Sequence, residues 1–436
     1  MTSIAQVIPQ DIVQEIFVHI GGEDIVWLDV EHPKYFPWYL GHICSQWRIT
    51  LLSMPPRGLK AGKHQRNKEL TMNIVTYFLE WKRGHQFDLV LSCYCWSQEN
   101  IWTDMVDLLV AESARWRHVT LNICTRACGI PALYRVKDHL PSMQSLRLIG
   151  MYCQPKAPKN GHPRDIFTNI PSLTHIRLPW MSWNWGFDWS NLTHLHLEDM
   201  LSKGCQSIIC SLRQAINLNT LVTGALSNTS YMAERVTLPH LESWHVLDYR
   251  WLGCIKAPAL QNLYLHGGGK IEINVVISFL RESGCKLQSL TLFYIQVGED
   301  HRLAYLVEIL RHVPELVHLK VFDEFAYNIA DSIESINAPI LSDLVGPELP
   351  APRLQSLQVV VKFHHYAFTD RFVYGLSQLV LLRNGQAKTN GGRPLKSLIV
   401  GEGEISDESL RTLCEACRVE LRLIAFPGLG DLGLGV

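Results

Sequence analysis

The feature that most constrains the fold of this 436-residue chain is a short apolar motif, Leu-x-x-Leu-x-Leu, that recurs along most of its length. The alternation at the end of each copy predicts a short strand with one buried face. The central apolar positions of consecutive copies lie 19 to 49 residues apart, which leaves room for a loop or a helix between strands. The copies are MQSLRL (143–148), LTHIRL (173–178), LTHLHL (192–197), LESWHV (241–246), LQNLYL (260–265), LQSLTL (287–292), LVHLKV (316–321), LQSLQV (354–359) and LKSLIV (395–400).

A series of strand–helix units at such periods is the signature of leucine-rich repeats. We therefore predict an α/β fold for residues 69–425, a curved solenoid with parallel strands inside and helices outside, followed by a Gly-rich tail at 426–436. The clearest helix is 273–283, with Val275, Phe279 and Leu280 facing inward and Gly284 as its C-terminal cap. Further helices are expected at 203–215, 301–312, 371–383 and 406–417.

Two apolar helices are expected before the repeats, at 8–20 and 38–52. Pro9 suits the first turn of a helix, where its missing N–H is not needed. The first helix carries an apolar stripe that is wider than one core requires, which predicts a second partner besides its own module. This stripe consists of Ile8, Ile12, Val13, Ile16, Phe17 and Ile20. The apolar residues at helical spacing on the second helix are Leu40, Ile43, Cys44, Trp47 and Leu51.

The segments around these helices predict where the module ends. Gly21 and Gly22 are expected to end the first helix, before a loop at 23–37. Residues 55–68 are rich in Pro, Gly and positive charge, which predicts a linker and makes 1–54 a small helical module. The basic run within 55–68 is open to two interpretations, a solvated linker or a nuclear localisation signal.

The helical module resembles a known family. Ile8-Pro9-x-x-Ile12-x-x-x-Ile16-Phe17, followed by Ile43-Cys44-x-x-Trp47-Arg48, resembles the F-box in the form common in expanded fungal families, with Asp11 at a position where that pattern has Glu. Segments 78–92, 115–123 and 189–197 also resemble parts of those proteins. The resemblance implies docking onto the Skp-type adaptor of an SCF ubiquitin ligase through Ile8, Pro9, Ile12, Val13, Ile16, Phe17, Ile43, Cys44, Trp47 and Arg48. The alternative is that both helices only cap the following domain.

Composition narrows the classes of function. The net charge of −1 and the pI near 7 argue against a general affinity for nucleic acid or for an acidic membrane. No secretory signal and no apolar run of transmembrane length is recognised. The twelve cysteines are interpreted as reduced thiols, so a cytoplasmic or nuclear location, or both, is expected.

Several fragments raise the question of an enzyme. The sequence HGGG (266–269) resembles an oxyanion-hole loop, but the chain has no Gly-x-Ser-x-Gly nucleophile elbow, and a loop after a repeat strand explains the glycines. Cys414 and Cys417 lack a second pair at zinc spacing, and the tryptophan-rich stretch 180–189 is interpreted as packing. No cofactor and no metal is expected, although His194 and His196 leave a metal hydrolase as a third hypothesis.

The repeat register predicts which side chains face away from the core on the inner, concave sheet. The predicted face is rich in histidine, contains one acid, Glu198, and exposes Phe293 and Phe322. We expect it to bind an acidic or phosphorylated segment, more strongly as the pH falls through about 6.5. Its candidate substrate-binding residues are Arg147, His175, Arg177, His194, His196, His245, Tyr264, His318 and Lys320, in the same rows as Thr291 and Gln358.

These observations predict a non-catalytic substrate-recognition subunit of an SCF-type ubiquitin ligase. Its partners would be the Skp-type adaptor, the cullin-based ligase bound through that adaptor, and a protein substrate of unknown identity. The alternative is a leucine-rich-repeat scaffold that binds a partner without recruiting a ligase.

Overall fold

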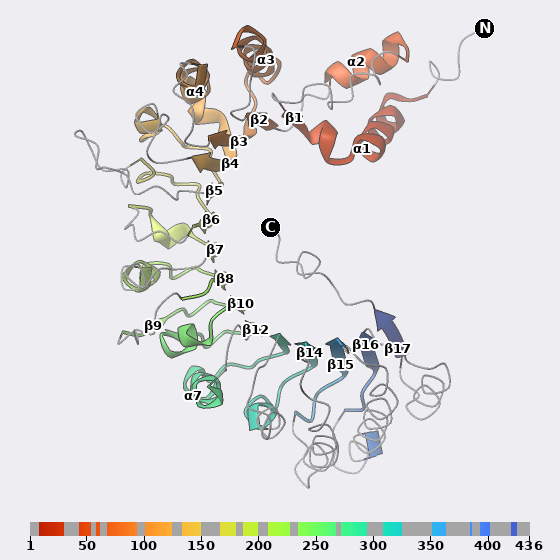
Figure 1. Ribbon diagram of the computed structural model, residues 1–436, viewed down its shortest axis with the longest axis vertical. Helices are drawn as coiled ribbons and strands as arrows, with labels where there is room; N and C mark the ends of the chain where they lie inside the picture. The colour runs from red at the N-terminus through yellow and green to blue at the C-terminus, as the bar shows by residue number, and fades with distance from the viewer. Residues whose placement is uncertain are drawn as a thin grey trace. The chain divides into compact units, whose positions relative to one another are not determined.

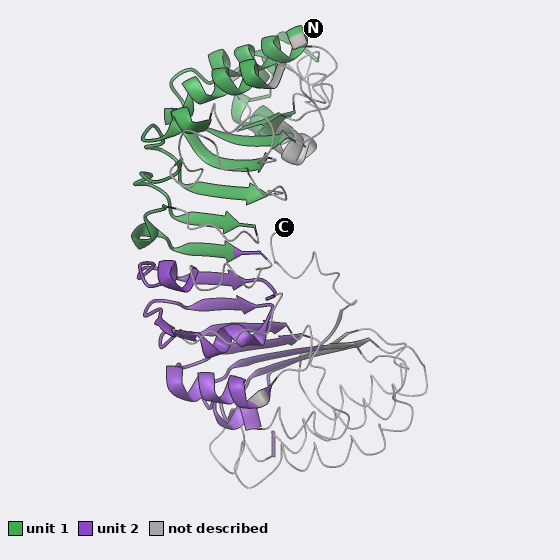
Figure 2. Cartoon of the chain, turned by 60° about the vertical axis from the view of Figure 1, so that its left-hand side comes forward, with its two compact units in different colours: residues 1–196 green, residues 197–436 purple. Residues whose placement is uncertain are grey.

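The computed structural model divides the chain into two compact units, residues 1–196 and 197–436 (Figures 1 and 2). Each unit is described by itself. The structure describes residues 8–29, 43–53, 58–61, 68–93, 101–123, 133–149, 166–179, 186–198, 208–226, 234–266, 272–293, 308–324, 351–362, 384–385, 393–401 and 420–424.

Unit 1 begins with helices and continues into a parallel sheet. Its strands β1 to β6 pair in chain order as parallel neighbours, and β7 lies beside β6. The helices are α1 (Gln10–Val26), α2 (Ser45–Ser53), α3 (Lys68–Trp81) and α4 (Ile101–Ala111). The strands are β1 (Trp27–Asp29), β2 (Gly58–Ala61), β3 (Phe87–Cys93), β4 (Trp116–Ile123), β5 (Ser145–Ile149), β6 (His175–Leu178) and β7 (His194–Leu197).

Unit 2 repeats the same plan. Its sheet has the strand order β8-β10-β12-β13-β14-β15-β16-β17, with every pair parallel. These strands are β8 (Thr220–Thr223), β10 (Ser243–Val246), β12 (Asn262–His266), β13 (Ser289–Phe293), β14 (His318–Glu324), β15 (Ser356–Lys362), β16 (Ser397–Gly401) and β17 (Glu420–Ile424). A separate pair joins β9 (Val236–Thr237) to β11 (Ile255–Lys256), and the helices are η8 (Tyr249–Gly253) and α7 (Ile273–Ser283).

The core follows the alternation that the motif predicts. On β5 and β12 the burial alternates residue by residue, with Leu146, Leu148, Leu263 and Leu265 at most 2% exposed. In unit 2 the inward side chain of Trp244 meets Phe279 of α7 edge to face, with ring centroids 5.5 Å apart. The buried leucines therefore face the helical layer, and the residues between them form what we call the outward face of each unit.

One hydrogen-bonding step recurs at the start of successive strands. The backbone carbonyl of the residue just before one strand accepts the N–H groups of two consecutive residues at the start of the next repeat strand. The Gln144 carbonyl accepts from Thr174 and His175, and the Thr174 carbonyl accepts from Thr193 and His194. In unit 2 the carbonyls of Asn219, Glu242, Gln261, Gln288, Val317 and Gln355 do the same. Because this step is repeated, the first residues of successive strands occupy equivalent positions.

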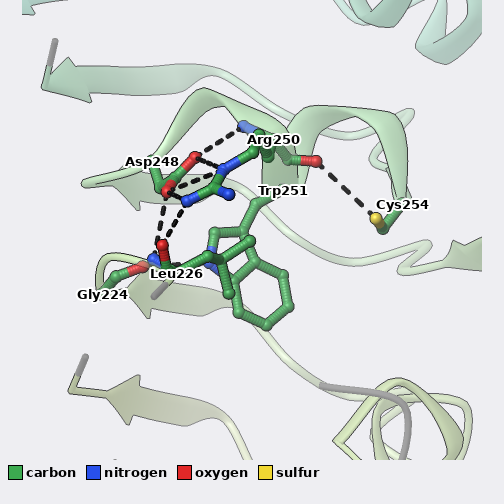
Figure 3. A network of polar contacts seen from close by, with 6 residues as sticks. All are labelled: Gly224, Leu226, Asp248, Arg250, Trp251 and Cys254. Atoms are coloured by element: carbon green, nitrogen blue, oxygen red, sulfur yellow. Dashed lines mark hydrogen bonds and ion pairs between the residues drawn. The ribbon is translucent and has the colours of Figure 1, made fainter. Parts of the chain in front are cut away.

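A polar network braces two neighbouring repeats of unit 2 (Figure 3). Asp248 accepts hydrogen bonds from the backbone N–H of Leu226 at 3.0 Å and from the Arg250 side chain at 2.9 Å. The Trp251 indole donates to the Gly224 carbonyl at 3.0 Å, and Arg250 donates to the Leu226 carbonyl. Burial alone would raise the pKa of Asp248, but the hydrogen bonds from Arg250 and Leu226 outweigh it and lower that pKa.

Three sequence-based expectations differ from the structure near the N-terminus. Helix α1 continues through Gly21 and Gly22 to Val26, because glycine costs a helix interior only about 1 kcal/mol each and does not by itself end it. Residues 23–29 of the loop expected at 23–37 instead form the end of α1 and strand β1, and residues 30–37 lie outside the described residues. Within the expected linker at 55–68, residues 58–61 form the buried strand β2 between β1 and β3. The helices are thus joined directly to the sheet of unit 1.

The repeat helices are described only in part. Helix α7 matches the predicted 273–283, and Gly284 caps it with φ 60° and an N–H donated to the Leu280 carbonyl. The buried valine is Val276, whereas Val275 is half-buried. Parts of the expected helices at 203–215 and 301–312 are helical, at 208–212 and 308–311. The helices expected at 371–383 and 406–417, and the tail at 426–436, lie outside the described residues.

Candidate functional site

Helices α1 and α2 form a packed pair. Phe17 and Trp47 meet edge to face with ring centroids 5.2 Å apart, and both side chains are buried together with Val13. The Gln46 side-chain amide donates to the Ile8 carbonyl at 2.8 Å, which ties the start of α1 to α2. Of the residues predicted to bind an adaptor, Val13, Phe17 and Trp47 therefore stabilise the pair itself.

The same two helices expose apolar side chains. Ile12 is 46% exposed, Ile43 just before α2 is 50% exposed, and Ile49 is 65% exposed. Ile16, Ile8 and Cys44 are half-buried, whereas Pro9 and Arg48 are exposed. Sequence analysis missed Ile49. Its position two residues after Trp47 places it on the opposite side of α2 from that buried ring, which could have indicated its exposure. Three of the six large apolar side chains found exposed in the described part of the chain belong to this short region.

The outward face of unit 1 is the second candidate surface. Arg147 of β5 and Arg177 of β6 are directly paired positions, and both side chains are half-buried. Two arginines opposite each other on neighbouring strands concentrate positive charge, which like-charge repulsion opposes. His118, Ser145 and His175 form the adjacent row. His196 of β7 is half-buried, and Glu198 follows β7.

A stacked histidine pair lies on this face. The rings of His175 and His194 are 4.1 Å apart between centroids and 9° from parallel. Both side chains are exposed, and each Nδ1 contacts the hydroxyl of the preceding threonine, at 2.8 Å for Thr174 and 2.9 Å for Thr193. Partial burial, followed by the neighbouring His194 and His118, lowers the pKa of His175, and partial burial lowers the pKa of His194.

The outward face of unit 2 has a different character. His245 of β10 stacks on Tyr264 of β12, with ring centroids 3.9 Å apart and planes 12° from parallel. Burial lowers the pKa of His245 to about 4, so this ring is neutral at physiological pH. Burial also lowers the pKa of His266. His318 and Lys320 of β14 are exposed, and Lys320 lies in the predicted central row.

Several predicted properties of this face differ from the structure. Thr291 is 2% exposed and Gln358 is 7% exposed, although both occupy the predicted outward row. Phe293 and Phe322 are buried rather than exposed, because they stack on each other with ring centroids 4.6 Å apart. The lowered pKa values of His175, His194, His245 and His266 also move the protonation of these four rings below the expected pH of about 6.5. The charge that an acidic ligand would meet is therefore carried mainly by Arg147 and Arg177 in unit 1.

The fragments that raised the question of an enzyme are described only in part. Among the described residues, no group of three or more His, Cys, Asp or Glu side chains is placed to hold a metal ion. Trp189 and Phe187 are buried and pack edge to face, as expected for the tryptophan-rich stretch. Residues 267–269, Cys414 and Cys417 lie outside the described residues. None of the described helices combines the length and the apolar character of a membrane span.

Sequence analysis also missed part of the outward face of unit 1. Strands β1 and β2 add Trp27, Asp29 and Lys60, and the Lys60 ammonium lies 5.4 Å from the centre of the Trp27 ring. These strands have three and four residues, too few for the period-2 alternation to stand out from the surrounding sequence. Asp29 is thus an acid on the outward face of unit 1 that the sequence-based prediction did not include.

Comparison with known proteins adds little to this geometry. No protein-family model matches the chain, and no curated protein matches it. Among solved structures, the crystal structure of a Bacteroides fragilis protein determined by a structural genomics consortium is 13% identical in sequence, with a TM-score of 0.27. The match covers 84% of this chain and 75% of the other. A similarity at this level supports no inference about function, so the functional argument rests on the residues themselves.

Proposed function

We propose that this protein is a non-catalytic substrate-recognition subunit of an SCF-type ubiquitin ligase. In this proposal the α1–α2 pair is an F-box that docks a Skp-type adaptor. The parallel strands of the leucine-rich-repeat-like sheet present the surface that binds a protein substrate.

The observation that carries the proposal is that the helix pair has two sets of apolar side chains, one buried between the helices and one exposed. Val13, Phe17 and Trp47 are buried and hold α1 against α2, whereas Ile12, Ile43 and Ile49 leave large apolar surfaces in water. Large apolar side chains exposed within one small region favour an interaction surface there. The sequence pattern that resembles an F-box includes the buried Phe17 and Trp47 and the exposed Ile12 and Ile43, so a single motif contributes both to the packing and to the exposed surface.

Such a subunit promotes a reaction without a nucleophile of its own. It raises the local concentration of substrate lysines near a ubiquitin-conjugating enzyme that the assembled ligase carries. This mechanism requires only two binding surfaces on one chain.

The substrate segment that best fits unit 1 is acidic or phosphorylated. Arg147 and Arg177 are paired across β5 and β6, and planar guanidinium groups suit carboxylate and phosphate oxygens. An anion bound beside them would also offset the repulsion between the two arginines. His196, His245, Tyr264, His318 and Lys320 remain candidates for further contacts on their own units.

Reconstitution tests the proposal. The full chain is co-expressed with a Skp-type adaptor and purified through a tag on the adaptor, and the complex is then combined with cullin, the conjugating enzyme and ubiquitin. We expect a stoichiometric complex that joins the ligase. A folded chain that never co-purifies with the adaptor would contradict the F-box assignment and favour a repeat scaffold that recruits no ligase.

A further inference from the structure

One row of the outward face of unit 1 has a histidine on each side of a serine. Ser145 of β5 is paired with His118 of β4 and with His175 of β6, and these three strands are neighbours in the sheet (Figure 1). Beyond His175, the ring of His194 stacks on it with centroids 4.1 Å apart and planes 9° from parallel. The row of rings is therefore interrupted at Ser145 by a small side chain.

The spacing of the strands suits one planar ring at the Ser145 position. Neighbouring strands lie about 4.8 Å apart, so the backbones that carry His118 and His175 are about 9.6 Å apart. A ring midway between them would lie about 4.8 Å from each neighbour, within the range of stacked aromatic pairs. Rings on neighbouring strands of this chain stack at similar separations, 4.1 Å for His175–His194 and 4.6 Å for Phe293–Phe322. A ligand ring can therefore continue the stack at the position where the chain has a serine.

His175 presents an uncharged aromatic surface to this position. Partial burial, followed by the neighbouring His194 and His118, lowers the pKa of His175 below its ordinary value of 6.5, so its neutral form predominates at pH 7. The Thr174 hydroxyl contacts Nδ1 of this ring at 2.8 Å, which restricts its rotation. The His175 side chain is exposed. This row therefore favours an aromatic group over an anion at the Ser145 position.

Positive charge lies in the next row along the same strands. Arg147 follows Ser145 by two residues on β5, so it points to the same face about 6.7 Å further along the strand. Arg177 of β6 is paired with Arg147. Because rings that stack across strands have planes that run along the strands, a para substituent on the inserted ring can point toward these arginines. The group that fits both rows is an aromatic ring with an anion at its para position.

We propose that the outward face of unit 1 binds a phosphotyrosine of the substrate, with its ring stacked between His118 and His175 and its phosphate at Arg147 and Arg177. A phosphate carries a charge of about −1.5 to −2 at pH 7 and three acceptor oxygens, which suits two guanidinium groups. Phosphoserine and phosphothreonine bring the phosphate without a ring, and aspartate and glutamate bring neither the ring nor the second charge. This inference rests on the substrate surface proposed above, but it does not depend on adaptor docking.

Fluorescence anisotropy with the full chain, in the absence of any adaptor, tests this specificity. Three labelled peptide libraries of equal length, with randomised flanks, carry phosphotyrosine, phosphoserine or tyrosine at a fixed central position. We expect the phosphotyrosine library to bind about tenfold or more tightly than the phosphoserine library, because two ring contacts add to the same phosphate contacts. The tyrosine library should bind most weakly. Equal affinity for the two phosphorylated libraries, or no binding of either, would overturn the proposal.

Ser145→Leu fills the position of the ligand ring without a change of charge. We expect its affinity for the phosphotyrosine library to fall to that for the phosphoserine library, while phosphoserine binding stays unchanged. The matched control is Ser243→Leu, a half-buried serine at the equivalent position of β10, whose paired neighbours Thr220 and Asn262 carry no ring. This control should bind like the wild type. An unchanged preference for phosphotyrosine in Ser145→Leu, or an equal loss in Ser243→Leu, would contradict the assignment.

His175→Ala provides a second test that adds no bulk to the sheet. Loss of one stacking partner is expected to weaken phosphotyrosine binding by about threefold or more and to leave phosphoserine binding unchanged. His318→Ala, which removes an exposed histidine from the first position of β14, is its control and should bind like the wild type. Circular dichroism verifies that all four variants are folded. Wild-type affinity of folded His175→Ala for the phosphotyrosine library would exclude stacking on His175.

Discussion

Phe17 of α1 and Trp47 of α2 meet edge to face, with ring centroids 5.2 Å apart and planes at 67°. Edge-to-face contact is a favoured geometry for aromatic pairs and adds to the free energy of burial. Both side chains belong to the sequence pattern that resembles an F-box, and both are removed from water. This contact therefore stabilises the helix pair, which also exposes Ile12 and Ile49.

Phe17→Ala is expected to destabilise the helix pair by about 3 kcal/mol or more, because a fully buried ring leaves a cavity. Ile12→Ala on the same helix is the matched control, and its 46% exposed side chain predicts a loss of under about 1 kcal/mol. Urea unfolding followed by tryptophan fluorescence measures both. Equal losses in the two variants would contradict the packing described for α1.

Gly58→Ala is expected to destabilise unit 1 by about 1–3 kcal/mol through overpacking. A Cβ at Gly58 would overlap the Trp27 ring and would lie 2.7 Å from the Asp88 carbonyl oxygen, which belongs to the backbone of the neighbouring strand. Gly253→Ala provides the control, since nothing lies within 4 Å of its added Cβ. The shift of the urea midpoint distinguishes them, and an unchanged midpoint in Gly58→Ala would argue against β2 as a strand between β1 and β3.

Stability is expected to fall as the pH decreases from about 6.5 to about 4, in part because of His245. Burial lowers its pKa to about 4, while the unfolded chain takes up a proton near pH 6.5, so protons favour the unfolded state between these values. His245→Phe keeps a ring against Tyr264 and removes the titration, so its unfolding free energy should depend less on pH in this window. Denaturant unfolding at pH 7 and pH 5 measures this difference. A slope equal to that of the wild type would contradict the buried, neutral state of His245.

Reversal of charge at the paired arginines tests the substrate surface. We expect Arg147→Glu together with Arg177→Glu to abolish capture of an acidic or phosphorylated substrate, since the variant repels the ligand. Adaptor binding should be unchanged, because these residues lie on β5 and β6 rather than on the helix pair. Lys256→Glu is the control, since this exposed lysine of unit 2 belongs to β11, outside the main sheet. Substrate capture that is unaffected by both the arginine reversal and added salt would exclude this face.

The sequence predicted the repeat strands well because burial on one face leaves a period-2 pattern. It missed β8, where Leu218-x-x-Leu221 is followed by Thr223 instead of a third leucine. Thr223 is fully buried in that position, and its hydroxyl accepts a hydrogen bond from the Trp244 indole at 3.2 Å. A polar residue satisfied by a partner 21 positions away leaves no local signal.

The sequence pattern predicted which residues belong to the candidate site, but it did not predict which of their side chains are exposed. Val13 and Ile12 are neighbours in sequence and both apolar, yet one is buried and the other exposed, which depends on where α2 packs. The stacking of His175 on His194 depends on strand register across a gap of 19 residues, and the burial of Phe293 by Phe322 depends on the pairing of β13 with β14. Contacts between segments that are distant in sequence decide which of these side chains are exposed, and the local periodicity of the sequence does not show such contacts.

The central claim, that the helix pair docks an adaptor, is tested most directly by calorimetric titration of a purified Skp-type adaptor into the full chain. We expect tight 1:1 binding by the wild type and at least about 30-fold weaker binding after Ile12→Ala and Ile43→Ala, a loss of about 2 kcal/mol or more. Ile216→Ala, which removes an isoleucine 53% exposed on unit 2, should bind like the wild type. No binding by the folded wild type, or equal affinity in the double variant, would contradict the account.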